Sequence, residues 1–115
     1  MSNKKFIVAL NALFILLAIS TCYGKMVNSK DFIEKPKAVR SGDTIRLDLG
    51  FTAASANWIK PDVKIENESI FVSGKLSFKE LPQIVSIKLP DSHKNYRLFW
   101  VDEDGKKTEI PVLKK

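Results

Sequence analysis

Two residue types that build catalytic and metal sites are almost absent from this sequence, which has one cysteine, Cys22, and one histidine, His93. A single cysteine cannot form a disulfide within the chain, and a tight zinc or copper site needs several ligands from His, Cys, Asp, Glu or Met. His93 ends the tripeptide Asp91-Ser92-His93, but adjacent residues on one turn do not readily align hydroxyl, imidazole and carboxylate in series. We therefore expect a non-enzymatic protein with no cofactor and no bound metal.

Acidic residues gather at one place only, the run Asp102-Glu103-Asp104. Its oxygen atoms are the ligand type that calcium prefers, but the spacing differs from that of an EF-hand loop. The Asp104-Gly105 pair is also typical of a tight hairpin turn, which explains the run without a metal. We predict a turn here and no calcium site.

Charged residues are missing from Phe6 to Ile19, a run that follows Lys4 and Lys5 and precedes the short segment STCYG. This order of basic, apolar and small residues is typical of a secretory signal peptide. The apolar run is shorter than the roughly 20 residues that cross a bilayer as a helix. We predict a signal peptide over residues 1–24, cleavage after Gly24, and a periplasmic or secreted protein.

Cys22 leaves a second possibility for the N-terminus, because Ile19-Ser20-Thr21-Cys22 resembles the lipobox of bacterial lipoproteins. In that family the cysteine becomes the lipidated first residue, and Gly, Ala or Ser precedes it, where this chain has Thr21. The resemblance implies membrane anchoring through Cys22. The alternatives are that Cys22 leaves with the signal peptide, or that the apolar run stays as an uncleaved anchor.

A strong excess of one charge is also missing after residue 24, where 17 basic and 13 acidic residues give a net charge of +4. Charges of both signs are interspersed, which is typical of an ordinary solvated surface. Together with the predicted export, this balance argues against nucleic acid as a partner.

The strongest structural pattern lies between Tyr96 and Val112. Tyr96, Leu98 and Trp100 share one face of an extended chain, and Arg97, Phe99 and Val101 share the other. The pair Asp104-Gly105 then predicts a two-residue hairpin turn, after which Thr108, Ile110 and Val112 continue the returning strand. The second face of this hairpin is either covered by the protein itself or meets a partner.

Alternating segments recur every eight to twelve residues along the rest of the chain, and no segment has a helical period. Thr44 to Phe51 is the clearest, with Ile45, Leu47, Leu49 and Phe51 on its inner face. Gly74, inside another such segment, predicts a bulge or bend. We predict an all-β fold, a small antiparallel β-sandwich of six or seven short strands over residues 44–115, preceded by an N-terminal arm over residues 25–43.

The segment from Tyr96 to Val112 resembles the last two strands of immunoglobulin-like and fibronectin-type-III-like domains of bacterial envelope proteins. There, an aromatic strand of the Y-x-L-x-W kind turns at a D-G pair into a short apolar strand. The resemblance implies an immunoglobulin-like sandwich and does not imply a ligand.

Three residues are candidates for a partner-binding surface: Trp58, which stands beside a loop, and Arg97 and Phe99 on the outer hairpin face. Aromatic residues and arginine are favoured at protein interfaces. We predict a module that binds another envelope or secreted protein, either as an inhibitor or immunity factor or as an accessory subunit of an envelope assembly. The alternative is a lipid-anchored structural or ligand-handling module that binds glycans or lipid head groups through a basic patch of Lys75, Lys79, Lys88, Lys94 and Arg97.

Overall fold

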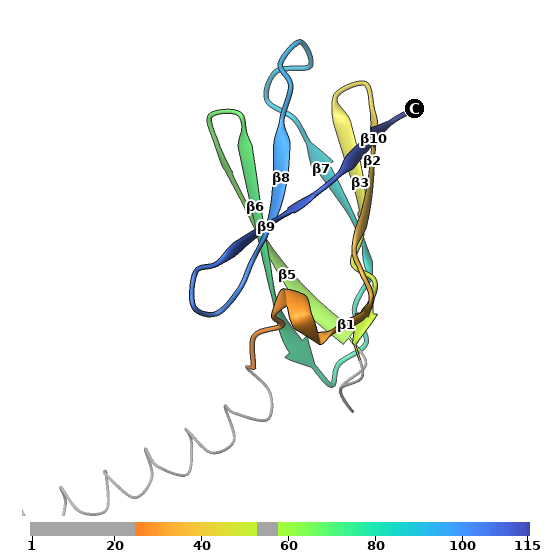
Figure 1. Cartoon of the computed structure of the whole chain (residues 1–115). Helices are drawn as coiled ribbons and strands as arrows, with labels where there is room; N and C mark the ends of the chain where they lie inside the picture. The colour runs from red at the N-terminus through yellow and green to blue at the C-terminus, as the bar shows by residue number, and fades with distance from the viewer. Residues whose placement is uncertain (1–24, 53–57) are drawn as a thin grey trace, which may run out of the picture.

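The chain folds into two four-stranded β-sheets packed face to face, with a small two-stranded sheet at one end (Figure 1). The computed structural model describes residues 25–52 and 58–115, so the predicted signal peptide, Cys22 and the predicted loop residues 53–57 lie outside the described part. In chain order the elements are the 3-10 turn η1 (Ser29–Asp31), β1 (Phe32–Glu34), β2 (Lys37–Ser41), β3 (Thr44–Asp48), β4 (Phe51–Thr52), β5 (Trp58–Glu66), β6 (Ser69–Ser77), β7 (Ile84–Lys88), β8 (Arg97–Val101), β9 (Lys107–Ile110) and β10 (Val112–Lys114).

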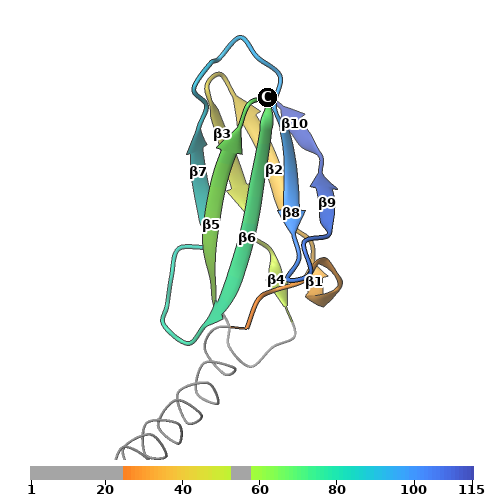
Figure 2. The same ribbon diagram turned by 90° about the vertical axis from the view of Figure 1, so that its left-hand side faces the viewer.

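The strand orders are β10-β2-β3-β7 in one large sheet, β5-β6-β8-β9 in the other and β1-β4 in the small sheet. Figure 2 shows the two large sheets with their strands running along the same direction. The predicted all-β sandwich is therefore confirmed. The strand count is higher than predicted, ten in the described residues, because β1, β4 and β10 are only two or three residues long. Two neighbouring pairs, β10 with β2 and β6 with β8, are parallel, so the sheets are mixed rather than antiparallel throughout.

The interior is built from the inward face of each alternating segment. Ile45, Leu47 and Leu49 are fully buried, as the period of two predicts. Phe51 was expected on the same face and is instead 48% exposed. The reason is Gly50, whose φ of +70° turns the chain out of line with β3 before β4 begins.

In the β8–β9 hairpin the face of Leu98 and Trp100 is the core face, and the turn is longer than predicted. Leu98 and Trp100 are buried, and Tyr96 is 9% exposed. The Gly105 N–H donates to the Asp102 carbonyl at 2.9 Å, and the Asp102 N–H donates to the Lys106 carbonyl at 2.8 Å. Within this turn only Gly105 has a positive φ, so the loop is a three-residue type ending in a left-handed glycine, and not the predicted two-residue turn.

The returning strand changes sheets at Pro111. Ile110 pairs with Leu98 in one sheet, whereas Val112 pairs with Ala38 in the other. The expected single strand through Thr108, Ile110 and Val112 is therefore divided into β9 and β10. Pro111 lacks a backbone N–H, so it cannot donate a hydrogen bond to a neighbouring strand. A proline is therefore compatible with the position where the chain leaves one sheet for the other.

Residues 25–43, expected as an arm, are part of the sandwich. β2 lies between β10 and β3 as an inner strand. Farther upstream, Val27 is 1% exposed, its N–H donates to the Gly74 carbonyl at 2.9 Å, and its carbonyl accepts from Trp100 Nε1 at 2.8 Å. Contacts between residues so far apart in sequence produce no local alternation of apolar and polar residues. For this reason the sequence alone predicted an arm here.

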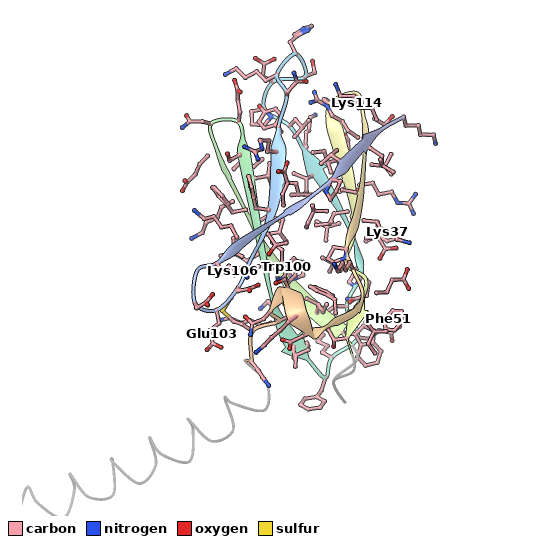
Figure 3. All side chains as sticks on the ribbon, viewed as in Figure 1. Lys37, Phe51, Trp100, Glu103, Lys106 and Lys114 are labelled. Atoms are coloured by element: carbon pink, nitrogen blue, oxygen red, sulfur yellow. The ribbon has the colours of Figure 1, made fainter. Side chains whose placement is uncertain are left out.

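Gly74 lies in a regular ladder opposite Pro61 and forms no bulge. A Cβ at this position would lie 2.5 Å from Ile59 Cγ2 and 2.9 Å from Trp100 Cη2. The glycine therefore makes room for the Trp100 indole, which lies between the sheets beside η1 (Figure 3).

Candidate protein-binding face

The outward side of the β5-β6-β8-β9 sheet carries a continuous row of side chains across all four strands. Lys64 on β5 is opposite Phe71 on β6, Phe71 is opposite Phe99 on β8, and Phe99 is opposite Glu109 on β9. Ile70, Val72, Leu98 and Trp100, which alternate with the two phenylalanines, are all buried in the core. Phe71 and Phe99 therefore face away from the core and are only partly covered.

The two phenylalanine rings stack on each other, with ring centroids 5.7 Å apart and an interplanar angle of 28°. Arg97 Cζ lies 5.2 Å from the centroid of Phe99, and Lys107 Nζ lies 4.7 Å from the centroid of Phe71. Both distances are within the range of cation–π attraction. We use the name aromatic patch for Phe71, Phe99, Arg97, Lys107 and Glu109.

Arg97 is held in place by a two-pronged contact to Glu109. Its Nη2 donates to Oε1 at 2.7 Å and its Nε donates to Oε2 at 3.3 Å. The hydrogen bond from Arg97 lowers the pKa of Glu109, and the same hydrogen bond raises the pKa of Arg97. The pair is exposed to solvent, so its main effect is to orient the guanidinium over Phe99.

A shallow hollow of about 260 Å³ adjoins the aromatic patch. It lies over β5, β6 and the end of β8, and it mixes acidic, basic and apolar groups rather than one sign of charge. Its lining residues are Asp62, Lys64, Glu66, Phe71, Ser73, Val101 and Lys107.

The structure brings together two of the three predicted partner-binding residues. Arg97 and Phe99 are neighbours in the aromatic patch. Trp58 is half-buried at the first residue of β5 and pairs with Ser77, six residues along β6 from Phe71. At roughly 3.3 Å per residue, Trp58 is about 20 Å from the patch. The three predicted residues therefore lie at two separate places on the surface.

Sequence reasoning missed Phe71, Lys107 and Glu109. A usable signal for Phe71 was present, because it stands between the apolar residues Ile70 and Val72 in an alternating segment, so it must point to the face opposite theirs. The neighbours Lys107 and Glu109 had no such signal, since their position depends on the length of the hairpin turn.

The remaining polar candidates hold backbone groups: Asp91 and Asp104 within their own turns, and Asp102 across to η1. Asp91 Oδ1 accepts from the backbone N–H of His93 at 2.9 Å, and Asp102 accepts from the backbone N–H of Ser29 at 2.8 Å and from its hydroxyl at 3.3 Å. Asp104 Oδ1 accepts from the backbone N–H of Lys106. Across residues 25–52 and 58–115, no three His, Cys, Asp or Glu side chains are grouped to hold a metal ion.

The five basic residues proposed as an alternative patch do not gather. Lys75 and Lys79 lie at and beyond the end of β6, whereas Arg97 pairs with Ser69 at its start. Lys88 ends β7 in the other sheet, and the Lys94 carbonyl accepts from Arg40 in a loop. A single basic surface made of these residues is therefore ruled out by their positions.

No protein-family model, no curated protein and no solved structure matches this chain. In the described part of the chain, none of the helical segments has the length and apolar character needed to cross a membrane.

Proposed function

We propose that this chain is an exported, non-enzymatic module of the cell envelope that binds another envelope or secreted protein through the aromatic patch. The observation that carries the proposal is the stacked Phe71–Phe99 pair on the solvent side of a sheet whose other outward residues are mainly charged or small. Natural sheets place polar residues on a solvated face, so two partly exposed aromatic rings there favour a contact surface.

The chemistry of the patch favours a protein over a charged polymer. Arg97 is neutralised by Glu109, and the neighbouring hollow contains carboxylates as well as lysines. Aromatic residues and arginine at the centre of a mixed polar rim are typical of protein interfaces. A stable contact covers about 800 Å² on each partner, so the rim residues of β5 and β9 would belong to it.

Within this class, an inhibitor or immunity factor and an accessory subunit of an envelope assembly both fit a rigid sheet face. The alternative is a module that binds glycans or lipid head groups through the basic residues first named for it, and its support is weaker because those five residues do not gather at one place. The dependence of binding on ionic strength distinguishes these two functions. Binding through the aromatic patch should persist as ionic strength rises, whereas a lysine-driven contact should weaken steeply.

The test is capture of partners from envelope extract with the full chain as bait, beside a variant with Phe71→Ser and Phe99→Ser. Leu113→Ser, at an exposed residue of β10, is the matched control. We expect one partner to be retained by wild type and control and lost by the patch variant. Trp58→Ala as a further bait tests the other predicted site. Equal capture by all baits would refute binding through the patch, and turnover abolished by His93→Ala would refute the non-enzymatic assignment.

We also propose that the sandwich is a variant of the immunoglobulin-like architecture. Two packed four-stranded sheets and the buried aromatic strand β8 support this assignment. The parallel pairing of β6 with β8 departs from the antiparallel neighbours of that fold. A crystal structure compared strand by strand with immunoglobulin-like domains tests it.

A further inference from the structure

Exposed apolar side chains are concentrated at one end of the sandwich. Among the described residues, five large hydrophobic side chains are strongly exposed, and four of them belong to the same end: Ile33 at 64%, Phe51 and Phe78 at 48% each and Ile84 at 46%. We call these four residues the apolar end. The fifth, Leu113, lies in β10.

The apolar end is assembled from segments that are distant in sequence. Ile33 and Phe51 belong to the β1–β4 pair, Phe78 follows the last residue of β6, and Ile84 begins β7. Figures 1 and 2 both show β1, β4 and the end of β6 at the lower end of the molecule. Figure 3 shows Phe51 there and Lys114 at the opposite end.

The N-terminal side of the chain joins the sandwich at this same end. The Lys25 carbonyl accepts a hydrogen bond from the Leu76 N–H at 2.8 Å, two residues before Phe78. Only five residues, 20–24, separate the end of the apolar run Phe6–Ile19 from Lys25. Even fully extended, that connection spans about 20 Å. A lipidated Cys22 would be closer still, so either attachment brings this end of the sandwich next to the bilayer.

The charges around the apolar end suit an anionic surface. Lys25, Lys35 and Lys79 are exposed there, and none of them forms an ion pair within the described residues. The acidic neighbours are Glu34, which pairs with Lys37 at 3.5 Å, Glu80, and Asp48, which is exposed and lies opposite Ile84 in the β3–β7 ladder. Phenylalanine and isoleucine beside lysine are typical of surfaces that rest in the headgroup region, where the apolar groups enter and the lysines meet lipid phosphates.

We propose that the apolar end is a membrane-contacting surface in the alternative in which the apolar run Phe6–Ile19 stays as an uncleaved anchor, so that this end rests on an anionic bilayer while the run tethers the chain. This inference concerns a different face from the aromatic patch and does not depend on the proposed function. Two phenylalanines and two isoleucines enter the headgroup region, and the strands then stand away from the membrane.

The test uses the full chain with Cys22→Ser, which leaves single engineered cysteines as the only attachment points for a nitroxide label. Ile33→Cys reports on the apolar end, and Leu113→Cys is the matched control, because the two parent residues are 64% and 66% exposed. The labelled chains are reconstituted in vesicles of phosphatidylethanolamine and phosphatidylglycerol. We expect the label at position 33 to collide more with lipid-soluble oxygen than with a water-soluble nickel complex, and the label at position 113 to show the reverse.

A third chain adds Phe51→Ser to the Ile33→Cys background. We expect its label to become more accessible to the nickel complex, because Phe51 is an exposed residue whose loss weakens membrane contact without emptying the core. Water-like accessibility at both positions in the first two chains would overturn the proposal. Spin–spin broadening at position 33 would also overturn it, since that result would mean that a second copy of the chain covers the apolar end.

Discussion

Trp100 is the residue where the most distant parts of the chain meet. Its indole N–H donates to the Val27 carbonyl, its ring meets Phe32 edge to face at 5.0 Å, and Gly74 makes room beneath it. Aromatic pairs of this geometry add to the free energy of burial. The N-terminal segment, β1, β6 and β8 therefore all depend on one side chain.

Replacing Trp100 tests this dependence. We expect Trp100→Ala to lower the free energy of unfolding by about 3–5 kcal/mol, because it leaves a large cavity and an unpaired buried carbonyl at Val27. That loss is most of the stability of a small domain, so the variant is expected to be largely unfolded. Urea denaturation measures it, and Trp58→Ala, at the half-exposed tryptophan, is the control. Near-native stability of Trp100→Ala would contradict the central position of this residue.

Single residues were predictable where alternation alone decides burial. Ile45 and Leu47 were expected inside and are buried, and Leu98 and Trp100, which were expected to share one face, are buried together. Alternation is a local property, so the sequence carries it directly. Gly74 shows the limit of prediction from alternation. A larger residue at this position would collide with Trp100, which is 26 positions away, and no residue near Gly74 in the sequence reveals this.

At the scale of elements, β8 and β9 are joined on their outer side by Arg97 and Glu109. Arg97 lowers the pKa of Glu109, so the folded state favours the ionised carboxylate. The stabilisation from this pair is present above the ordinary glutamate pKa of about 4.3 and is lost as the pH falls through the lower folded pKa. Arg97 stays protonated throughout.

We therefore expect the Glu109 carboxyl, followed by NMR, to titrate below the ordinary glutamate range in wild type and within it in Arg97→Gln. The substitution should also reduce stability slightly at about pH 6, and much less once the pH has fallen below the lowered folded pKa of Glu109, where its carboxyl is protonated in both states. Identical Glu109 titration in the two proteins would mean that the contact does not persist in solution.

Pairing between elements was largely beyond prediction from sequence. The parallel neighbours β6 and β8 are separated in the chain by β7, which belongs to the other sheet. Which strand lies beside which depends on packing across the whole sandwich and not on the pattern within a strand. For this reason Phe99 was identified without its stacking partner: the alternation gives the outward direction of Phe71, but not its place beside Phe99.

At the scale of the whole molecule, the two sheets are linked differently along their two sides. On one side, Pro111 carries the chain directly from β9 to β10. On the other, β5 and β7 are the outermost strands, and the Gln83 side chain connects them. Its Oε1 accepts from the Ile59 N–H at 3.1 Å, its Nε2 donates to the Ile59 carbonyl at 3.3 Å, and its own carbonyl accepts from the Leu49 N–H at 2.9 Å.

Gln83 should therefore keep this side of the sandwich closed. We expect Gln83→Ala to cost about 1–3 kcal/mol, because both backbone groups of Ile59 lose their partner. Gln83→Glu keeps an acceptor but loses the Nε2 donor, so its effect should be comparable. Hydrogen exchange of the Ile59 amide should accelerate in Gln83→Ala while that of Leu98, in the central strand β8, changes only with global stability. Unchanged exchange at Ile59 would show that the sheets are held together without Gln83.

The crossing of the chain from β9 to β10 also affects when the protein can fold. Val112–Lys114, the last strand in the chain, pairs with β2, and Val27, close to the first described residue, completes the core beneath Trp100. The sandwich is therefore complete only when residues near both ends of the range 25–115 are in place. Contacts with such large sequence separation are slow to form. The sheet that contains β2 is therefore complete only after Val112–Lys114 has been synthesised, so the sandwich closes late in folding.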